Sequence, residues 1–209
     1  MSQGKFITFE GGDGSGKSTQ LSLTIAWLQA QGKEVIQTFE PGGSDLGQEI
    51  RKLLLSGEFI PVPACELLLF LADRAQHVEQ VIKPALLAGK WVVCDRYTDS
   101  TLAYQLAGRK LEDNGLLREM LQWAEQGLSP DQTIWLDLSV KDAAKRMAER
   151  QAGGEAANRL DEEKSSFHQS VYEAFQSIQL ENQKRMQRVD AKQSIEQVQS
   201  DIRDLLGQL

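Results

Sequence analysis

A glycine-rich run at residues 11–18, Gly-Gly-Asp-Gly-Ser-Gly-Lys-Ser, directly follows the apolar residues 6–9 and leads into a segment with helical apolar spacing. It matches the pattern G-x-x-x-x-G-K-[ST], a loop between strand and helix whose backbone N–H groups surround phosphate oxygens. The positive end of the following helix dipole adds to the attraction for an anion. A glycine-rich turn with a chance Lys-Ser is the alternative, but the flanking strand and helix favour a site for a nucleoside triphosphate.

Two side chains in this run have separate expected roles. Lys17 is expected to contact the β- and γ-phosphates, and the Ser18 hydroxyl is expected to bind Mg²⁺. We assign the whole run and the next residue to the binding of this triphosphate: Gly11, Gly12, Asp13, Gly14, Ser15, Gly16, Lys17, Ser18 and Thr19.

The length and composition predict a single domain spanning residues 1–209, since 41% of the residues are hydrophobic and 25% are charged. A formal net charge of −7 argues against non-specific binding to nucleic acid or to an anionic membrane. We find neither a signal-peptide apolar core nor an apolar run long enough to span a bilayer, so we expect a cytoplasmic protein.

The two cysteines, Cys65 and Cys94, each stand among apolar residues, and we expect both to be buried, reduced thiols. The two histidines, His77 and His168, are distant from them in the sequence. No spacing typical of a zinc site results.

Five short apolar runs, at residues 6–9, 35–39, 91–94, 133–138 and 186–189, alternate with helical patterns. Their continuous apolarity is typical of parallel strands that are covered by helices on both faces. The sequence therefore predicts an α/β fold of the P-loop NTPase type, with three α/β/α layers and a five-stranded parallel sheet.

Residues 151–158 interrupt a helix that carries Arg146 and Arg150, and Gly153 and Gly154 stand inside the interruption. We interpret residues 146–160 as a short mobile lid that brings arginines to the site. On composition alone a plain surface loop is an equal alternative.

Asp95-Arg96-Tyr97 stands at the end of the third predicted strand, where ligands gather in open α/β sheets. Asp95 could hold Mg²⁺ through water, and Arg96 could bind phosphate oxygens with two hydrogen bonds. A structural ion pair that closes the strand is the alternative.

Two further arginines, Arg51 and Arg74, lie on otherwise apolar helices, and Glu40-Pro41-Gly42-Gly43 offers a tight turn that a substrate could approach closely. Either arginine alone could simply extend to solvent. Together with Arg96 they could surround a phosphate that the glycine-rich loop does not hold, which predicts phosphoryl transfer between two phosphates.

These motifs occur in the order found in bacterial thymidylate kinases, and the chain resembles that family over nearly its whole length. The resemblance implies transfer of a phosphoryl group from ATP, with Mg²⁺, to dTMP. It also implies a homodimer. One departure is Phe39, which stands where many relatives have arginine before Glu-Pro-Gly-Gly.

The resemblance also implies roles in an acceptor site. Asp13 would meet the 3′-hydroxyl, Phe70 would stack on thymine, and Tyr104 would lie near C2′ and disfavour a ribose. Arg74 would bind the base edge, and Arg51 with Arg96 would hold the acceptor phosphate. The expected dTMP-binding residues are Asp13, Glu40, Pro41, Arg51, Phe70, Arg74, Arg96, Ser100, Thr101, Tyr104 and Gln105.

Since residues 12–15 contain no arginine, the resemblance is to the type whose lid supplies one. Arg146, Arg150 and Arg159 are the candidates, with Arg146 assigned to ATP. The residues Asp190-Ala191 would lie beside the adenine. The expected catalytic residues are Lys17, Asp95, Arg96 and Arg150, and the expected metal ligands are Ser18 and Asp95.

Three alternative functions remain at this point. Another nucleoside monophosphate kinase, acting on dUMP, UMP or CMP, would share the same phosphate chemistry. A GTPase would need an Asn/Thr-Lys-x-Asp segment, which residues 139–142 do not match. A nucleotide-binding regulator without catalysis is the third alternative.

Overall fold

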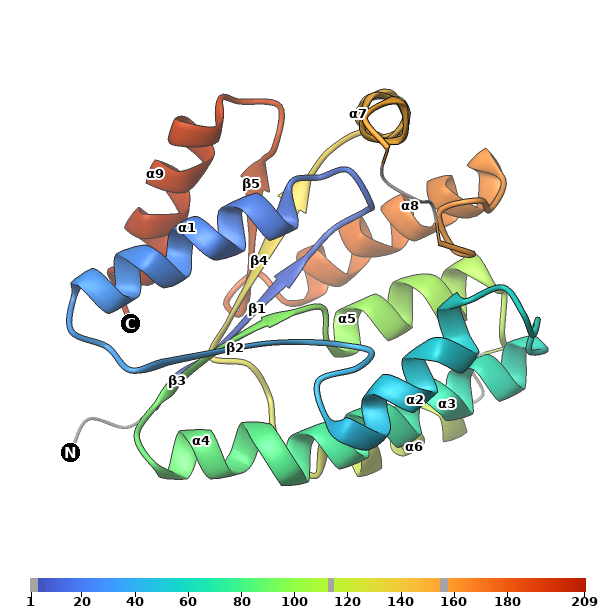
Figure 1. The fold of residues 1–209 in the computed structure, drawn as a ribbon, viewed down its shortest axis with the longest axis horizontal. Coiled ribbons are helices and arrows are strands. Elements are labelled where there is room, and N and C mark those ends of the chain that lie inside the picture. The colour runs from blue at the N-terminus through green and yellow to red at the C-terminus, as the bar shows by residue number, and fades with distance from the viewer. Residues whose placement is uncertain (1–3, 113–114, 155–157) are drawn as a thin grey trace.

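The structure, a computed structural model, describes residues 4–112, 115–154 and 158–209. In this part of the chain, parallel strands form a five-stranded sheet in the order β2-β3-β1-β4-β5 (Figure 1). The strands are β1 (Phe6–Glu10), β2 (Val35–Phe39), β3 (Trp91–Asp95), β4 (Gln132–Asp137) and β5 (Met186–Asp190). The predicted apolar runs all form strands, which confirms the P-loop NTPase type of α/β fold.

Helices cover both faces of the sheet (Figure 1). They are α1 (Lys17–Ala30), α2 (Asp45–Leu55), α3 (Pro63–His77), α4 (Lys83–Leu87), α5 (Thr98–Thr101), α6 (Leu116–Glu125), α7 (Val140–Ala152), α8 (Ser165–Glu181) and α9 (Ile195–Leu206). Two π-helical segments, η1 (Val78–Ile82) and η2 (Leu102–Gly108), continue α3 and α5.

The strand residues divide the core into two layers. Ile7 and Phe9 pack with α1 and α9 on one face, whereas Phe6 packs with η1 and α4 on the other. Trp135 extends this second face towards η2 and α8. Because successive side chains of a strand point to opposite faces, continuous apolar runs are what a sheet covered on both sides requires.

Helices α3 and α6 form an outer layer, in which Leu67 and Leu71 pack against Leu117 and Leu121. Cys65 lies on α3 and is exposed, so the expectation that it is buried was wrong. Only one side of α3 packs inward, and apolar sequence neighbours did not reveal which side that is. Cys94, on the inner strand β3, is buried as expected, and both thiols are free.

The helix N-termini differ in a way that matters for ligand binding. Ser44, Ser139 and Ser194 cap α2, α7 and α9, and each side chain accepts a hydrogen bond from the backbone N–H of the third residue of its helix. Helix α1 begins after Gly16, which offers no side-chain cap. Its first N–H groups are therefore left for an external anion.

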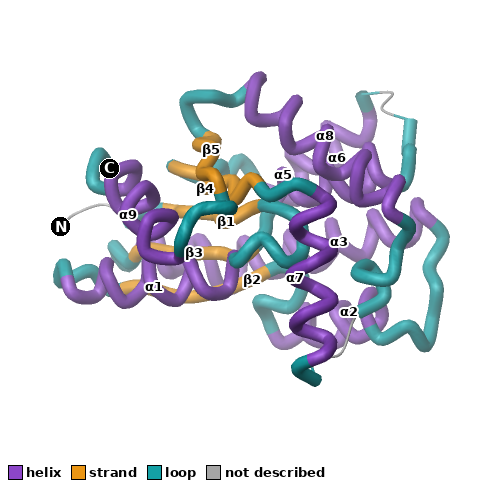
Figure 2. Tube along the Cα trace, turned by 90° about the horizontal axis from the view of Figure 1, so that it is seen from above, coloured by secondary structure: helices purple, strands orange, loops and turns teal. Residues whose placement is uncertain are grey.

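Helix α7 lies above the carboxyl edge of the sheet in Figure 1 and towards the viewer in Figure 2. None of its described residues is fully buried. Residues 155–157 of the predicted lid lie outside the described residues, so the predicted lid mobility stays a prediction. In the described ranges no helix is both long and apolar enough to cross a membrane.

Candidate active site

A cavity of about 1080 Å³ lies at the carboxyl edge of the sheet, bounded by the segments that follow all five strands. The glycine-rich loop forms its floor, and α7 contributes Arg146, Met147 and Arg150 from the other side. Parallel pairing places these strand ends together: Phe9 pairs with Asp95, and Glu10 pairs with Trp135. Ligands of open α/β sheets bind at this edge.

The glycine-rich loop is shaped by left-handed backbone at Gly14 and Gly16, with φ angles of 79° and 93°. A Cβ atom at Gly14 would approach Ala143 O to 2.8 Å, so the loop also fits closely under α7. Lys17 Nζ donates to the carbonyl oxygens of Gly11 and Gly12, at 3.0 Å each. These bonds hold the ammonium group over the loop, where a phosphate could accept from it.

The charge of Lys17 is balanced only in part by its surroundings. Burial and the nearby Arg96 lower the pKa of Lys17, whereas Asp13 and Asp95 oppose that effect. Among the described residues, Asp95 Oδ1 is buried without a hydrogen-bond partner. Asp95 and Ser18 both line the cavity, so an oxygen-binding cation between them and a phosphate would satisfy this atom.

Arg96 joins the loop to the end of β3. Its NH2 atom donates to Asp13 Oδ1 at 2.6 Å, and its NH1 atom donates to Gly11 O and Ser100 Oγ at 3.1 Å each. The backbone of Arg96 is left-handed, with a φ of 68°, which is costly for a residue with a side chain. This backbone conformation aims the guanidinium into the cavity.

Asp13 and Tyr104 complete this cluster. The Tyr104 hydroxyl donates to Asp13 Oδ2 at 3.1 Å, and the Arg96 guanidinium lies over the Tyr104 ring at 4.9 Å. Burial disfavours the charged form of Asp13, but Arg96 and Lys17 outweigh it and lower its pKa to about 2. Asp13 is therefore a carboxylate at neutral pH and can accept from a ligand hydroxyl.

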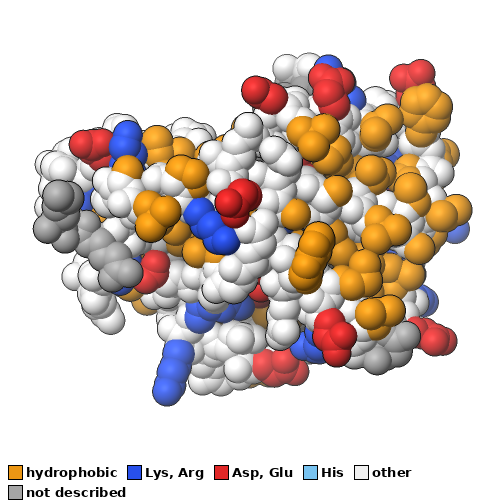
Figure 3. Space-filling view, turned by 90° about the horizontal axis from the view of Figure 1, so that it is seen from below, with side chains coloured by type: hydrophobic (Ala, Val, Ile, Leu, Met, Phe, Trp, Pro, Cys, Tyr) orange, Lys and Arg blue, Asp and Glu red, His pale blue; other side chains and the backbone are white. Residues whose placement is uncertain are grey.

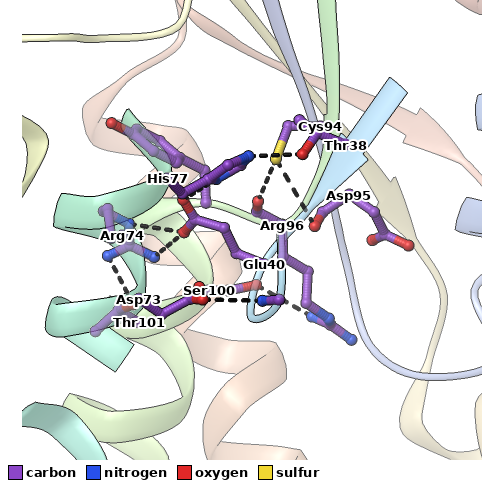
Figure 4. A network of polar contacts seen from close by, with 12 residues as sticks. Thr38, Glu40, Asp73, Arg74, His77, Cys94, Asp95, Arg96, Ser100 and Thr101 are labelled. Carbon is purple, nitrogen blue, oxygen red and sulfur yellow. Dashed lines mark hydrogen bonds and ion pairs between the residues drawn. The ribbon is translucent and has the colours of Figure 1, made fainter. Parts of the chain in front are cut away.

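A buried network extends behind the cavity from Glu40 (Figure 4). Arg74 Nε donates to Glu40 Oε2 at 2.8 Å, and Arg74 NH1 donates to Thr101 Oγ1 at 3.0 Å. His77 Nδ1 pairs with Glu40 Oε1 at 2.8 Å, and His77 Nε2 pairs with Thr38 at 2.6 Å. These contacts fix the guanidinium of Arg74 at the wall of the cavity.

The turn after β2 packs tightly on this network. Gly42 N donates to Asp73 Oδ1 at 3.0 Å, and a Cβ atom at Gly43 would collide with His77 Nε2. Burial, with the nearby Glu40, raises the pKa of Asp73 to about 6. The second glycine is thus required by close approach to a buried imidazole.

Arg51 reaches the cavity from α2. Its NH1 atom donates to Pro41 O at 2.8 Å, and its guanidinium lies 5.4 Å from the centre of the Phe39 ring. Phe39, the departure from the family pattern, is thus a ring on which this cation rests. Both residues line the cavity.

The structure brings nearly all predicted site residues around the same cavity. Those that line it are Asp13, Gly14, Ser15, Gly16, Lys17, Ser18, Thr19, Glu40, Pro41, Arg51, Phe70, Arg74, Asp95, Arg96, Ser100, Thr101, Tyr104, Gln105, Arg146 and Arg150. Gly11 and Gly12 do not line it, but their carbonyl oxygens hold Lys17. The individual roles of these residues stay predictions.

The three candidate lid arginines differ in whether they reach the cavity. Arg146 and Arg150 line the cavity, and Arg146 NH2 donates to Ala191 O at 2.8 Å. Arg159 does not line it: its NH2 atom pairs with Glu66, and its Nε atom donates to Leu54 O at 3.0 Å. Arg159 therefore anchors the C-terminal end of the predicted lid.

Several residues that line the cavity were not predicted from the sequence. Gln193, Ile195 and Val198 line the cavity near Ala191, and only their position after the last strand could have indicated them. His77 and Glu66 were not predicted to belong to the site either. Their hydrogen-bond partners are far away along the chain, so no local sequence pattern indicates that these two residues are part of it.

Glu10, at the end of β1, was also missed, although it directly precedes the glycine-rich loop. It is fully buried and accepts from Tyr97 N at 2.8 Å and from Ser100 Oγ at 2.5 Å. Burial, with the nearby Asp99, raises the pKa of Glu10 to about 7, although the hydrogen bonds and Arg96 oppose this. Glu10 thus fixes the backbone that carries Arg96 and Ser100.

Comparison with known proteins gives a consistent result. The family model described as thymidylate kinase matches residues 9–202. The chain is 48% identical to a thymidylate kinase of Clavibacter sepedonicus over 200 residues, covering 96% of this chain and 93% of the relative. It is 42% identical to a thymidylate kinase of a Nostoc species over 206 residues, covering 98% and 96% respectively.

The Glu10 environment predicts a specific pH dependence of stability. Because the folded-state pKa exceeds the unfolded value, Glu10 stabilises the fold at low pH, and this contribution is lost as pH rises from 4.5 through about 7. The free energy of unfolding in urea should fall between pH 5 and pH 8, and this fall should be smaller in Glu10→Gln than in the wild type by roughly 2–3 kcal/mol. The exposed Glu34→Gln variant is the control, and parallel pH profiles for wild type and Glu10→Gln would contradict the prediction.

Proposed function

Because the chain belongs to the thymidylate kinase family, which phosphorylates dTMP to dTDP, we propose that it carries out this transfer with ATP and Mg²⁺ in the cavity at the carboxyl edge of the sheet. The observation that carries the proposal is the arrangement of two cationic groups around one space. Lys17 stands on the glycine-rich loop, and Arg51 and Arg96 stand on the far side. Each can hold one phosphate of a donor–acceptor pair.

The triphosphate would bind at the N-terminus of α1. Lys17, held by two loop carbonyls, would contact the β- and γ-phosphates, and Arg146 with the residues after β5 would border the adenine. Ser18 and Asp95 would hold Mg²⁺, which supplies positive charge that neutralises the phosphates. The described residues contain no group of three or more metal-binding side chains, which suits an ion that takes phosphate and water oxygens as its other ligands.

The acceptor would bind beyond the carboxyl ends of β2 and β3. Arg51 and Arg96 would hold its phosphate, Phe70 would stack on the base, and Asp13 would accept from the 3′-hydroxyl. The Tyr104 hydroxyl bonds to Asp13, which places its ring beside the sugar. These assignments rest on the family resemblance and on the position of each side chain along the cavity wall.

The reaction we propose is direct in-line transfer. The acceptor phosphate is already ionised near neutral pH, so no general base is assigned. Arg96 positions the attacking oxygen, and Arg150, on the roof of the cavity, would stabilise charge on the transferred group. A lid that excludes water would favour transfer to dTMP over hydrolysis.

A homodimer is also part of the proposal, and an apolar surface supports it. Helices α2, α3 and α6 pack side by side and expose Leu53, Leu68, Leu116 and Trp123. Figure 3 shows hydrophobic side chains gathered over one half of this face. Monomeric proteins seldom expose apolar patches of this kind, so a second copy of the chain is the occupant we propose. We place the enzyme in the cytoplasm, where ATP and dTMP are available.

The first test of the function is ADP formation from ATP and Mg²⁺ with dTMP, dUMP, UMP, CMP, GMP and AMP side by side. Strong turnover with dTMP is expected. The preference over dUMP should be modest, since one methyl group contributes roughly 1–3 kcal/mol. A preference for another monophosphate would overturn the assigned base pocket, and turnover with none would favour a regulator without catalysis.

The two cationic groups can be tested separately. Lys17→Ala and Arg96→Ala should each lower turnover with dTMP at least roughly 10²-fold with the fold retained, as expected when one preorganised donor is removed. Circular dichroism would monitor folding, and the exposed Lys184→Ala is the matched control. Near wild-type turnover would remove the tested residue from the site.

If the apolar surface on α2, α3 and α6 is the dimer interface, a charged substitution in it should change the molar mass of the protein in solution. Light scattering after size exclusion should give twice the chain mass for the wild type. Trp123→Asp, at a side chain that is 78% exposed, should shift the protein towards monomer. Leu180→Asp, at a similarly exposed residue on α8, should leave the dimer intact. A monomeric wild type would contradict the proposal.

A further inference from the structure

Glu66 is a fully buried carboxylate on α3 that lies beside the cavity but does not line it. Its Oε1 atom accepts from Gln105 Nε2 at 3.0 Å and from Arg109 Nε at 2.9 Å. Its Oε2 atom accepts from Arg109 NH2 at 3.1 Å and from Arg159 NH2. Each oxygen thus accepts two hydrogen bonds, which is about the full capacity of a carboxylate.

The neighbouring charges keep Glu66 ionised. Burial alone would raise its pKa, but the hydrogen bonds from Arg109, Gln105 and Arg159 lower it instead. Glu163 accepts from Arg109 NH1 at 2.5 Å. The negative charges of Glu66 and Glu163 thus balance the positive charges of Arg109 and Arg159. At neutral pH Glu66 is therefore an acceptor only.

This fact decides which way the Gln105 amide points. A side-chain amide has a donor end and an acceptor end, and a carboxylate can receive only the donor end. Gln105 Nε2 must therefore face Glu66. The carbonyl Oε1 is the end left for the cavity, which Gln105 lines, and among the described residues it accepts no hydrogen bond.

The orientation has a chemical consequence beside Arg74. The guanidinium of Arg74, fixed by Glu40 and Thr101, is a donor on the same cavity wall. A donor next to an acceptor matches a pyrimidine that has a carbonyl at position 4 and an N–H at position 3. Cytosine presents an amino group and an unprotonated nitrogen at these positions, so both contacts would be mismatched.

We propose that Glu66 is a positioning residue that fixes the Gln105 amide, so that the acceptor pocket selects pyrimidines with an N3–H group and rejects cytosine. The inference rests on the proposed function, because it takes the wall formed by Arg74 and Gln105 as the base pocket. It does not separate thymine from uracil, which share this edge.

The same carboxylate joins the base pocket to the C-terminal end of the predicted lid. Arg159, at that end, bonds to Glu66 and to Leu54 O at the end of α2. Arg109 ends η2, the segment that carries Gln105, and its guanidinium lies over the Phe167 ring at 4.8 Å. Glu66 thus joins three segments that are far apart in the sequence: its own helix α3, the segment of Gln105 and Arg109, and the segment of Arg159.

The test is Glu66→Gln, assayed for kcat/KM with dTMP and dCMP. The new amide can offer a donor to Gln105, which allows Gln105 to turn its own NH₂ group towards the base. The ratio of kcat/KM for dTMP over dCMP should fall at least about tenfold, whereas general damage to the fold would lower both values together. Glu163→Gln, which alters the same cluster without touching Gln105, should keep the wild-type ratio.

A second variant covers the case in which Glu66→Gln does not fold. Gln105→Leu removes the carbonyl and should lower the same ratio by a similar factor. If Glu66→Gln folds, the double variant should lower the ratio no further than Gln105→Leu alone, because both changes remove one interaction. A wild-type ratio in folded Gln105→Leu, or in folded Glu66→Gln, overturns the inference. A wild-type protein that does not phosphorylate dTMP would instead overturn the proposed function.

Discussion

The placement of β1 between β3 and β4 is the constraint on which the site depends. Parallel hydrogen bonding aligns Phe9 with Asp95 and Glu10 with Trp135, so the loops after these strands emerge at one edge. The glycine-rich loop then lies within reach of Arg96, whose guanidinium binds Asp13 and the carbonyl of Gly11. Without that alignment, these groups would have no common space to surround.

Buried cations around the cavity are held by partners rather than left to solvent. Arg74 forms an ion pair with Glu40, and Arg96 forms an ion pair with Asp13. For the fully buried pair of Arg74 and Glu40, removing one partner costs roughly 3–5 kcal/mol, mostly because the remaining charge is left uncompensated. The pairs therefore keep both guanidinium groups oriented at the cavity wall, so that a ligand binding there would require little reorganisation of them.

The lid region combines a loosely packed helix with a firmly held root. Helix α7 has no fully buried residue in the described ranges, and elements with few buried contacts open at low free-energy cost. Arg159, at the C-terminal end of the predicted lid, is bonded to Glu66 and to the carbonyl of Leu54. These contacts hold the end of the lid against α2 and α3.

The strands and the glycine-rich loop could be predicted from the sequence, because they depend on local apolar runs and on motifs at strand ends. Other cavity residues, such as Phe70, Tyr104 and Gln105, were predicted only through the family resemblance. It was wrong about Cys65, since apolar neighbours do not reveal which side of an outer helix faces inward. Only the tertiary structure decided the partners of His77 and Glu66, which lie 37 positions away at Glu40 and 43 and 93 positions away at Arg109 and Arg159. A buried charge selects its partner by three-dimensional proximity, and no local spacing in the chain encodes that choice.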